Sequence, residues 1–280
     1  MFRNVAELVE LAESQNKKIS DIMIEQEMEF TGKTFEQIYS QMEKNLEVME
    51  QALARGLEGV KSHSGLTCGD TILDAVSKAV ATNEVNAAMG TICATPTAGS
   101  AGVVPGTLFA VKNKLNPTKD EMIRFLFASG AFGFVVANNA SISGAAGGCQ
   151  AEVGSASGMA AAAIVEMAGG TPSQSAEAMA ITLKNMLGLV CDPVAGLVEV
   201  PCVKRNAMGA ANAMVAADMA LAGITSRIPC DEVIDAMYKI GQTMPVALRE
   251  TAQGGLAATP TGRELEAKIF GVSLSKREDS

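Results

Sequence analysis

Apolar residues recur at intervals of three and four along much of the chain, and this spacing predicts amphipathic helices. The clearest helix is expected to start at Thr34, whose side chain would share a capping box with Gln37. It is expected to end at Gly56, because glycine readily terminates a helix. Between these ends one face is apolar and consists of Phe35, Ile38, Tyr39, Met42, Leu46, Met49 and Leu53.

The same start signals recur further along the chain. Thr118 with Glu121 and Thr171 with Gln174 repeat the capping spacing, so each pair predicts the start of a helix. Pro172 would take the first helical position after Thr171, where its fixed backbone angle is favourable. These two starts therefore predict two more helices.

Two shorter helices and the lack of strand patterns complete the prediction of an all-α fold. Asp70 is expected to cap a helix over residues 71–81, and residues 231–240 form a short amphipathic pattern. No convincing run of alternating β-branched residues occurs, and residues 198–203 are too short and are interrupted by proline. We therefore expect a single helical domain without a sheet.

Hydropathy divides the chain into three parts. Residues 1–59 are charged and amphipathic and are expected to form a helical N-terminal layer, residues 60–270 one continuous all-α body, and residues 271–280 a polar tail. Residues 85–111 and 125–151 carry no charge. Because Pro, Gly, Asn and Ser interrupt both stretches, a buried core is expected there rather than membrane spans.

Composition and charge narrow the possible functions. Apolar residues make up 48% of the chain but aromatic residues only 4%, so small side chains are expected to fill the core and to let helices approach closely. The formal net charge of −9 argues against binding to nucleic-acid phosphates, which requires clustered Lys and Arg. The N-terminus lacks the apolar segment of a secretory signal, so a cytoplasmic protein is expected.

Four segments between predicted helices combine glycine with hydroxyl groups and cysteine. They span residues 61–70, 93–106, 138–154 and 191–206. Glycine lets the backbone approach a ligand closely and hydroxyl groups supply hydrogen bonds, so a small anionic ligand could bind here. The candidate binding hydroxyl groups are those of Thr95, Thr97, Ser100, Ser141 and Ser143. Tight turns between packed helices are the alternative for any single segment.

Cysteines are candidate ligands for a metal or cluster, because the cytoplasm keeps thiols reduced rather than paired in disulfides. Three of the six lie in or beside the glycine-rich segments: Cys149, Cys191 and Cys202. Cys230 starts a predicted helix and is interpreted as a core residue, while Cys68 and Cys93 are ambiguous. The spacing matches neither a compact ferredoxin nor a zinc finger, so buried small apolar side chains are the alternative.

One histidine and a short basic segment are the other candidates. His63 could act as a general base or an anchor, or it is an ordinary surface histidine. Lys204, Arg205 and Asn206 directly follow Cys202 and could bind a carboxylate, or they form the solvated start of a helix. No histidine partner is identifiable for a serine or cysteine nucleophile, which argues against a hydrolase.

The glycine- and cysteine-rich segments resemble a known family. They read TPTAGSAGVVPG (95–106), NNASISGAAGGCQAEVGSASGMAAA (138–162), CDPVAGLVEVPCVKRNA (191–207) and RETAQGGLA (249–257). These segments closely resemble the iron-sulfur L-serine dehydratases, in the form whose α and β subunits are separate chains. The resemblance extends over most of the chain beyond about residue 60.

This resemblance implies an all-α catalytic subunit that holds a four-iron four-sulfur cluster with Cys149, Cys191 and Cys202. One iron would stay open as a Lewis acid for the β-hydroxyl group of serine, while a base removes the α-proton. Loss of water gives aminoacrylate, which tautomerises and hydrolyses to pyruvate and ammonia. Pyridoxal phosphate is not required.

The resemblance also implies partners. Fused members of the family carry an N-terminal regulatory β domain that is not part of this sequence, so we expect a separate β subunit, L-serine as substrate and a higher oligomer of αβ pairs. Some catalytic histidines of fused members belong to that domain, so the base comes from the partner or from His63. A cysteine desulfidase-like cluster enzyme and a non-catalytic helical binding protein are the competing interpretations. Neither a nucleic acid nor a membrane is expected as a partner.

Overall fold

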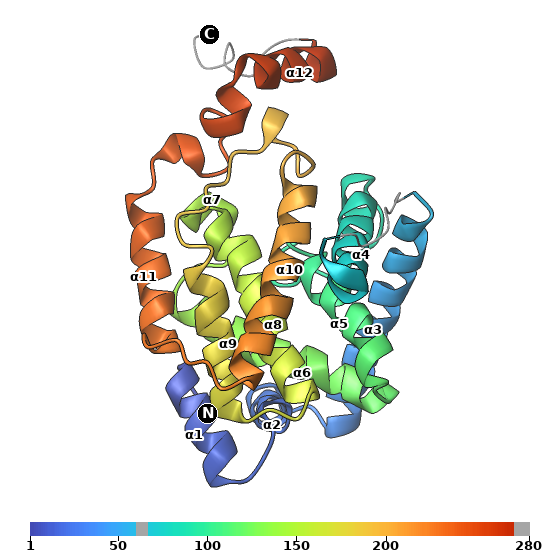
Figure 1. The fold of residues 1–280 in the computed structure, drawn as a ribbon, viewed down its shortest axis with the longest axis vertical. Coiled ribbons are helices and arrows are strands. Elements are labelled where there is room, and N and C mark those ends of the chain that lie inside the picture. Colours follow the sequence, from blue (N-terminus) through green and yellow to red (C-terminus); the bar gives the residue numbers. More distant parts are fainter. Residues whose placement is uncertain (60–66, 272–280) are drawn as a thin grey trace.

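The computed structural model describes residues 1–59 and 67–271, and within them the protein is built from helices (Figure 1). The α-helices are α1 (Val5–Ser14), α2 (Ile19–Thr31), α3 (Phe35–Leu57), α4 (Gly69–Ala87), α5 (Val103–Leu115), α6 (Lys119–Asn139), α7 (Gly144–Gly147), α8 (Ser155–Met167), α9 (Pro172–Lys184), α10 (Cys202–Leu221), α11 (Cys230–Thr243) and α12 (Pro260–Phe270). A π-helix, η1 (Gln150–Gly154), and three 3₁₀ turns, η2 (Val194–Gly196), η3 (Val246–Leu248) and η4 (Gly255–Ala258), connect them. The described residues form no sheet, so the predicted all-α fold is confirmed.

The capping signals in the sequence locate three helix starts correctly. The side chains of Thr34, Thr118 and Thr171 each accept a hydrogen bond from the backbone N–H three residues later, at the starts of α3, α6 and α9. The prediction for Asp70 was wrong. Helix α4 starts at Gly69, so Asp70 lies inside its first turn, where its negative charge favours the positive end of the helix dipole.

Helix α8 forms the centre of the molecule and is packed against α5, α6, α9 and α10. Its sequence is rich in alanine, and every residue from Ser155 to Glu166 is buried. Small side chains allow this close approach: a Cβ added at Gly158 would lie 3.0 Å from Met179 Cγ on α9. The core is therefore built from close helix packing rather than from large aromatic side chains.

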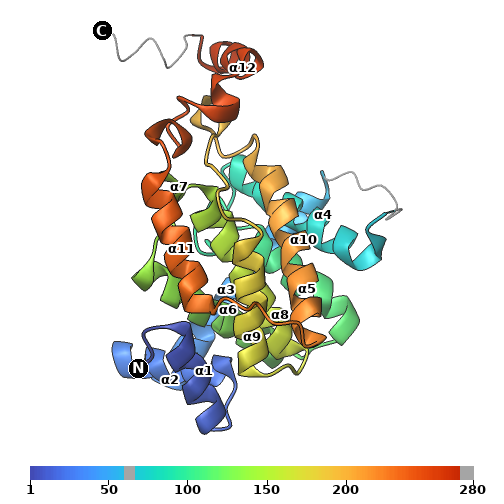
Figure 2. The ribbon, with the colours of Figure 1, turned by 60° about the vertical axis from the view of Figure 1, so that its left-hand side comes forward.

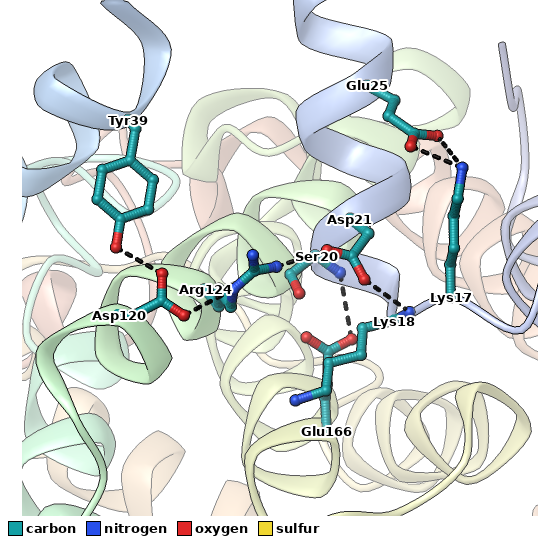
Figure 3. A network of polar contacts seen from close by, with 9 residues as sticks. All are labelled: Lys17, Lys18, Ser20, Asp21, Glu25, Tyr39, Asp120, Arg124 and Glu166. Atoms are coloured by element: carbon teal, nitrogen blue, oxygen red, sulfur yellow. Dashed lines mark hydrogen bonds and ion pairs between the residues drawn. The ribbon is translucent and has the colours of Figure 1, made fainter. Parts of the chain in front are cut away.

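The N-terminal helices lie against one end of this core, where α2 packs on α6 and α1 packs on α9. Polar contacts fix α2 in place (Figure 3). The carboxylate of Glu166 on α8 accepts a hydrogen bond of 3.2 Å from the backbone N–H of Ser20, in the first turn of α2. Arg124 on α6 forms an ion pair of 2.5 Å with Asp21. A buried carboxylate from the core thus satisfies a free N–H group at the start of α2.

The opposite end of the molecule carries the non-helical segments and α12, far from the N-terminal helices in both views (Figures 1 and 2). The expected loop over residues 138–154 is largely helical: α6 continues to Asn139, and α7 and η1 follow. Gly241 in α11 allows that helix to approach α7 closely, because a Cβ on Gly241 would lie 2.8 Å from the Cα of Gly147.

Several predictions fall partly or wholly outside the described residues. His63 and most of residues 61–70 lie in the gap, as does the expected boundary between residues 59 and 60, and residues 272–280 of the expected tail are also not described. Among the residues that are described, no helix is both long enough and apolar enough to cross a membrane.

Candidate active site

Three cysteines from separate segments meet at the end of the molecule that carries the non-helical connections. Cys149 immediately precedes η1, Cys191 lies in an extended segment, and Cys202 is the first residue of α10. They are only 2%, 3% and 8% exposed, and none forms a disulfide. The thiols are close enough that the negative charge of one raises the pKa of another in all three pairings. The fold therefore brings together the three cysteines singled out from the sequence.

The position of Cys191 depends on a distant part of the chain. Its backbone N–H donates to the carbonyl oxygen of Leu248 at 2.9 Å, and its carbonyl oxygen accepts from the N–H of Glu250 at 2.6 Å. These two bonds form an isolated parallel bridge between Cys191 and Arg249. Glu250 has a φ of +63°, a left-handed conformation that is rare for residues other than glycine and that concentrates at functional sites.

Burial strongly favours the neutral form of these thiols. Desolvation, together with the charge of Glu152, raises the pKa of Cys149 to about 12 and that of Cys202 to about 11. Desolvation also raises the pKa of Cys191, and the charges of Cys149 and Glu250 add to that effect. A bound cationic centre would compensate these charges and stabilise the thiolate forms.

Two carboxylates stand beside the cysteines, and the sequence interpretation did not select either. The hydroxyl group of Thr97 donates a hydrogen bond to Glu152, whose pKa is raised by burial and by the charge of Glu250. Gly144 leaves the space in which these groups meet: a Cβ added there would lie 2.9 Å from Cys191 Sγ, 3.0 Å from Glu152 Oε2 and 3.3 Å from Glu250 Oε2. The sequence did offer a signal, since Glu152 is the only charged residue between positions 124 and 166.

The segment that contains the candidate hydroxyl groups of residues 95–100 is held against α10. Ser100 Oγ donates to the carbonyl oxygen of Thr95 at 3.0 Å and lies 3.1 Å from Thr97 Oγ1, so these two hydroxyl groups already have partners within the protein. Thr95 Oγ1, by contrast, is buried without a hydrogen-bond partner. A buried polar atom without a partner is unusual and is often explained by a ligand or an ordered water.

The basic segment after Cys202 has largely structural contacts. Arg205 donates to the carbonyl oxygen of Val190 at 2.8 Å and forms an ion pair of 2.8 Å with Asp192, which is 3% exposed. Asn206 is completely buried and bonds to backbone groups, whereas Lys204 is exposed. The positive charge of Arg205 is therefore already neutralised by a carboxylate of the protein.

The remaining candidates are placed as follows. Ser141 and Ser143 are half-buried in the segment before α7, where the N–H of Ser143 donates to Ser141 Oγ at 3.1 Å. Cys68 is exposed and Cys93 half-buried, while Cys230 is buried at the start of α11, as its interpretation as a core residue requires.

The three cysteines are better suited to a metal cluster than to a single metal ion. Among the described residues, no three His, Cys, Asp or Glu side chains are arranged to bind a single metal ion. A polynuclear cluster makes a different demand, because each thiolate binds its own iron and the sulfur atoms stay further apart. Thiolate donors are also the usual ligands of iron-sulfur centres.

Comparison with known proteins places the chain in a family. A family model described as "Serine dehydratase alpha chain" matches residues 14–257, well over half of the sequence. The chain belongs to the serine dehydratase alpha chain family. The matched range includes the three cysteines, both carboxylates beside them and the segment that holds Cys191.

Individual relatives agree with this family membership. The chain is 79% identical to the "Probable L-serine dehydratase, alpha chain" of Bacillus subtilis strain 168, over 99% of this chain and 98% of that protein. It is 41% identical to the "L-serine dehydratase, alpha chain" of Peptoniphilus asaccharolyticus, over 95% and 97% of the two chains. It is 35% identical to "L-serine dehydratase TdcG" of Escherichia coli K12, over 91% of this chain but only 61% of that longer protein. Members of the family thus occur both as alpha chains of this length and as longer polypeptides.

Proposed function

We propose that the chain is the catalytic subunit of an L-serine dehydratase that converts L-serine to pyruvate and ammonia. The single observation that carries the proposal is the convergence of Cys149, Cys191 and Cys202 in a chain of this family. Alpha chains 79% and 41% identical to this one carry the same activity in their names and match it over almost their full length.

The proposed cofactor is a four-iron four-sulfur cluster held by Cys149, Cys191 and Cys202. Three buried thiols that are free of disulfides are suitable donors, and Gly144 leaves room beside Cys191 that a larger side chain would fill. When bound, the cluster supplies an iron with an open position that acts as a Lewis acid toward the β-hydroxyl group of serine. Cys202 is positioned by the N-terminus of α10, whose dipole favours a negatively charged sulfur.

The residues around the thiols have clear parts in this reaction. Dehydration removes the α-proton and the β-hydroxyl group of serine as water; the resulting aminoacrylate then tautomerises and takes up water to release ammonia and pyruvate. Burial raises the pKa of Glu152, so its carboxyl group can hold a proton closer to neutral pH than an exposed glutamate can. Thr97, which donates a hydrogen bond to Glu152, keeps that carboxyl group oriented.

A separate β subunit is part of the proposal. Relatives of the same length are named alpha chains, and the chain covers only about 60% of the longer relatives. The β chain would pair with this chain, and the base that removes the α-proton would come from that partner or from His63. A higher oligomer of such pairs and a cytoplasmic location complete the proposal.

The decisive experiment is iron and sulfide analysis of the anaerobically purified protein with its β chain, together with a pyruvate assay on L-serine and on L-cysteine. We expect bound iron and pyruvate from L-serine. Pyruvate from L-cysteine alone would overturn the dehydratase assignment in favour of a desulfidase. A colourless protein without iron or activity would indicate a non-catalytic helical binding protein.

Variants then test the ligand assignment. Replacing Cys149, Cys191 or Cys202 by Ala should remove both the iron and the activity. Cys230→Ala is the matched control, because Cys230 is equally buried but lies at the start of α11. Loss of iron from Cys230→Ala with retention in Cys202→Ala would contradict the assignment.

A further inference from the structure

Arg249 lies directly beside one of the three clustered cysteines. It is the bridge partner of Cys191, and the hydrogen bonds from Cys191 N–H to Leu248 and from Glu250 N–H to Cys191 flank it on both sides. In a parallel pairing, residues directly opposite each other project their side chains from the same face. The Arg249 side chain therefore leaves the backbone on the face from which the Cys191 thiol points.

The guanidinium group of Arg249 has no partner among the described residues. Its Nε is buried without a hydrogen bond, although Arg249 as a whole is only half-buried, and no ion pair or side-chain hydrogen bond involves this residue. Leaving a buried donor unsatisfied is costly, and native proteins seldom accept that cost without a ligand or water in the site. Arg205, the other arginine near the thiols, is already paired with Asp192.

The surroundings of the cysteines favour a cation as the group that binds an amino-acid substrate. Two carboxyl groups of the protein, those of Glu152 and Glu250, lie beside Cys191, 3.0 and 3.3 Å from the position of a Cβ on Gly144. A substrate carboxylate beside them is bound best where a positive charge can pair with it. The planar guanidinium group is suited to this task, because its Nε–H and one terminal N–H can donate in parallel to the two carboxylate oxygens.

We propose that Arg249 binds the α-carboxylate of the substrate through Nε and one terminal nitrogen, and so restricts the site to ligands with a free carboxylate. This inference rests on the proposed function for the identity of the substrate. It assigns carboxylate recognition to the segment after α11 rather than to Lys204, Arg205 and Asn206. Amides and esters of the same acid, which lack the negative charge, are excluded as good ligands.

The test compares Arg249→Gln with Arg249→Lys in the anaerobic holoenzyme with its β chain. The matched control is Arg3→Gln, because Arg3 is an exposed arginine that pairs with Glu7. Arg249→Gln should raise KM for L-serine by about 10- to 100-fold, the range expected for loss of a hydrogen-bonded charge, and Arg249→Lys should raise it less. The kcat and the iron content of both variants should stay within about threefold of the unaltered enzyme, and Arg3→Gln should change none of these values.

A binding measurement separates this proposal from the proposed function. Calorimetry should show that the unaltered protein binds 3-hydroxypropionate at least about 10-fold more tightly than its neutral amide, and that Arg249→Gln loses this preference. An unchanged KM and an unchanged preference in Arg249→Gln would overturn the role of Arg249, as would a lack of preference in the unaltered protein. If the preference depends on Arg249 but L-serine yields no pyruvate, the dehydratase assignment fails and carboxylate binding stands.

Discussion

Asn206 holds the backbone of Gly99, a residue 107 positions earlier in the chain, by a hydrogen bond of 2.8 Å from Nδ2 to the carbonyl oxygen. The other atom of the same amide, Oδ1, accepts from the N–H of Gly102 at 3.1 Å. Asn206 lies one turn after Cys202 on α10, so a single side chain joins the segment of Thr95 and Thr97 to the helix that carries a cysteine of the site.

We expect Asn206→Ala to lower the free energy of unfolding by about 1–3 kcal/mol, because it leaves the buried N–H of Gly102 without a partner. The carbonyl oxygen of Gly99 would keep only the longer hydrogen bond of 3.4 Å from Asn83. Activity should fall as well, since residues 95–102 lose their attachment to α10. Denaturant unfolding and a pyruvate assay measure the two effects. Asn185→Ala, at an exposed position, is the control and should change stability by less than about 0.5 kcal/mol. Equal effects of the two substitutions would show that the Asn206 bonds contribute little.

Gly144→Ala should reduce activity by at least about 10-fold and destabilise the protein by about 1–3 kcal/mol, the usual range for overpacking. The added methyl group would press on Cys191 Sγ and on Glu152. Gly130→Ala in helix α6 is the control, because a Cβ there meets no atom within 4 Å. That substitution should be neutral or stabilise by up to about 1 kcal/mol, as alanine does in a helix interior. An active Gly144→Ala enzyme with full iron content would refute the crowding argument.

The Asp192–Arg205 pair should behave as one structural unit. Arg205→Met leaves Asp192 buried and charged without its counter-ion, so a loss of about 3–5 kcal/mol is expected. The double variant Asp192→Asn, Arg205→Met should recover part of that loss, because it removes the unpaired buried charge. The amide oxygen of the double variant can still accept the hydrogen bond of 2.7 Å that Asp192 accepts from the N–H of Leu256. Unfolding free energies of the two single variants and the double variant form a complete cycle. Strictly additive losses would exclude the coupling.

Glu166 should make the protein less stable as the pH rises. Burial raises its pKa in the folded state, although the hydrogen bond from Ser20 opposes this shift, so the unfolded chain releases the proton first. The stabilisation is complete below the unfolded value of about 4.3 and is lost as pH rises through the folded pKa. Glu166→Gln keeps an oxygen acceptor for the Ser20 N–H but cannot ionise. Its melting temperature relative to the unaltered protein should therefore increase between about pH 4 and pH 7.

Glu121 supplies a control of opposite sign for that experiment. Its hydrogen bonds with Thr118 lower its pKa in the folded state, so its contribution is present above the unfolded value and is lost as the pH falls. Glu121→Gln should therefore be less stable than the unaltered protein at neutral pH, and the difference should shrink in acid. The same slope for both variants would contradict these assignments.

The helices were predictable where their signals are local. A threonine and a glutamine or glutamate three residues later are sufficient to place the starts of α3, α6 and α9. Local signals failed at residues 138–154, where glycine usually favours a loop. There α7 packs closely on Gly241 of α11, and that tertiary packing outweighs the low helix propensity of the segment.

The candidate site was predictable only in part. The composition around Cys149, Cys191 and Cys202 selected them, and the fold brings them together. Arg249 was not selected, because its proximity to Cys191 depends on a pairing between residues nearly 60 positions apart. No spacing rule in a single sequence reveals a contact of that kind. The neutralisation of Arg205 by Asp192 is likewise a property of the folded chain alone.

The pairing of Cys191 with residues 248–250 also determines when the site can form during synthesis. Cys149 and Cys202 are made well before residue 250, yet Cys191 has no fixed position until that late segment is in place. A nascent chain therefore cannot present all three sulfur atoms together. Insertion of the proposed cluster would therefore have to follow the synthesis of residues 248–250, and truncation before residue 248 should leave a helical protein without an assembled site.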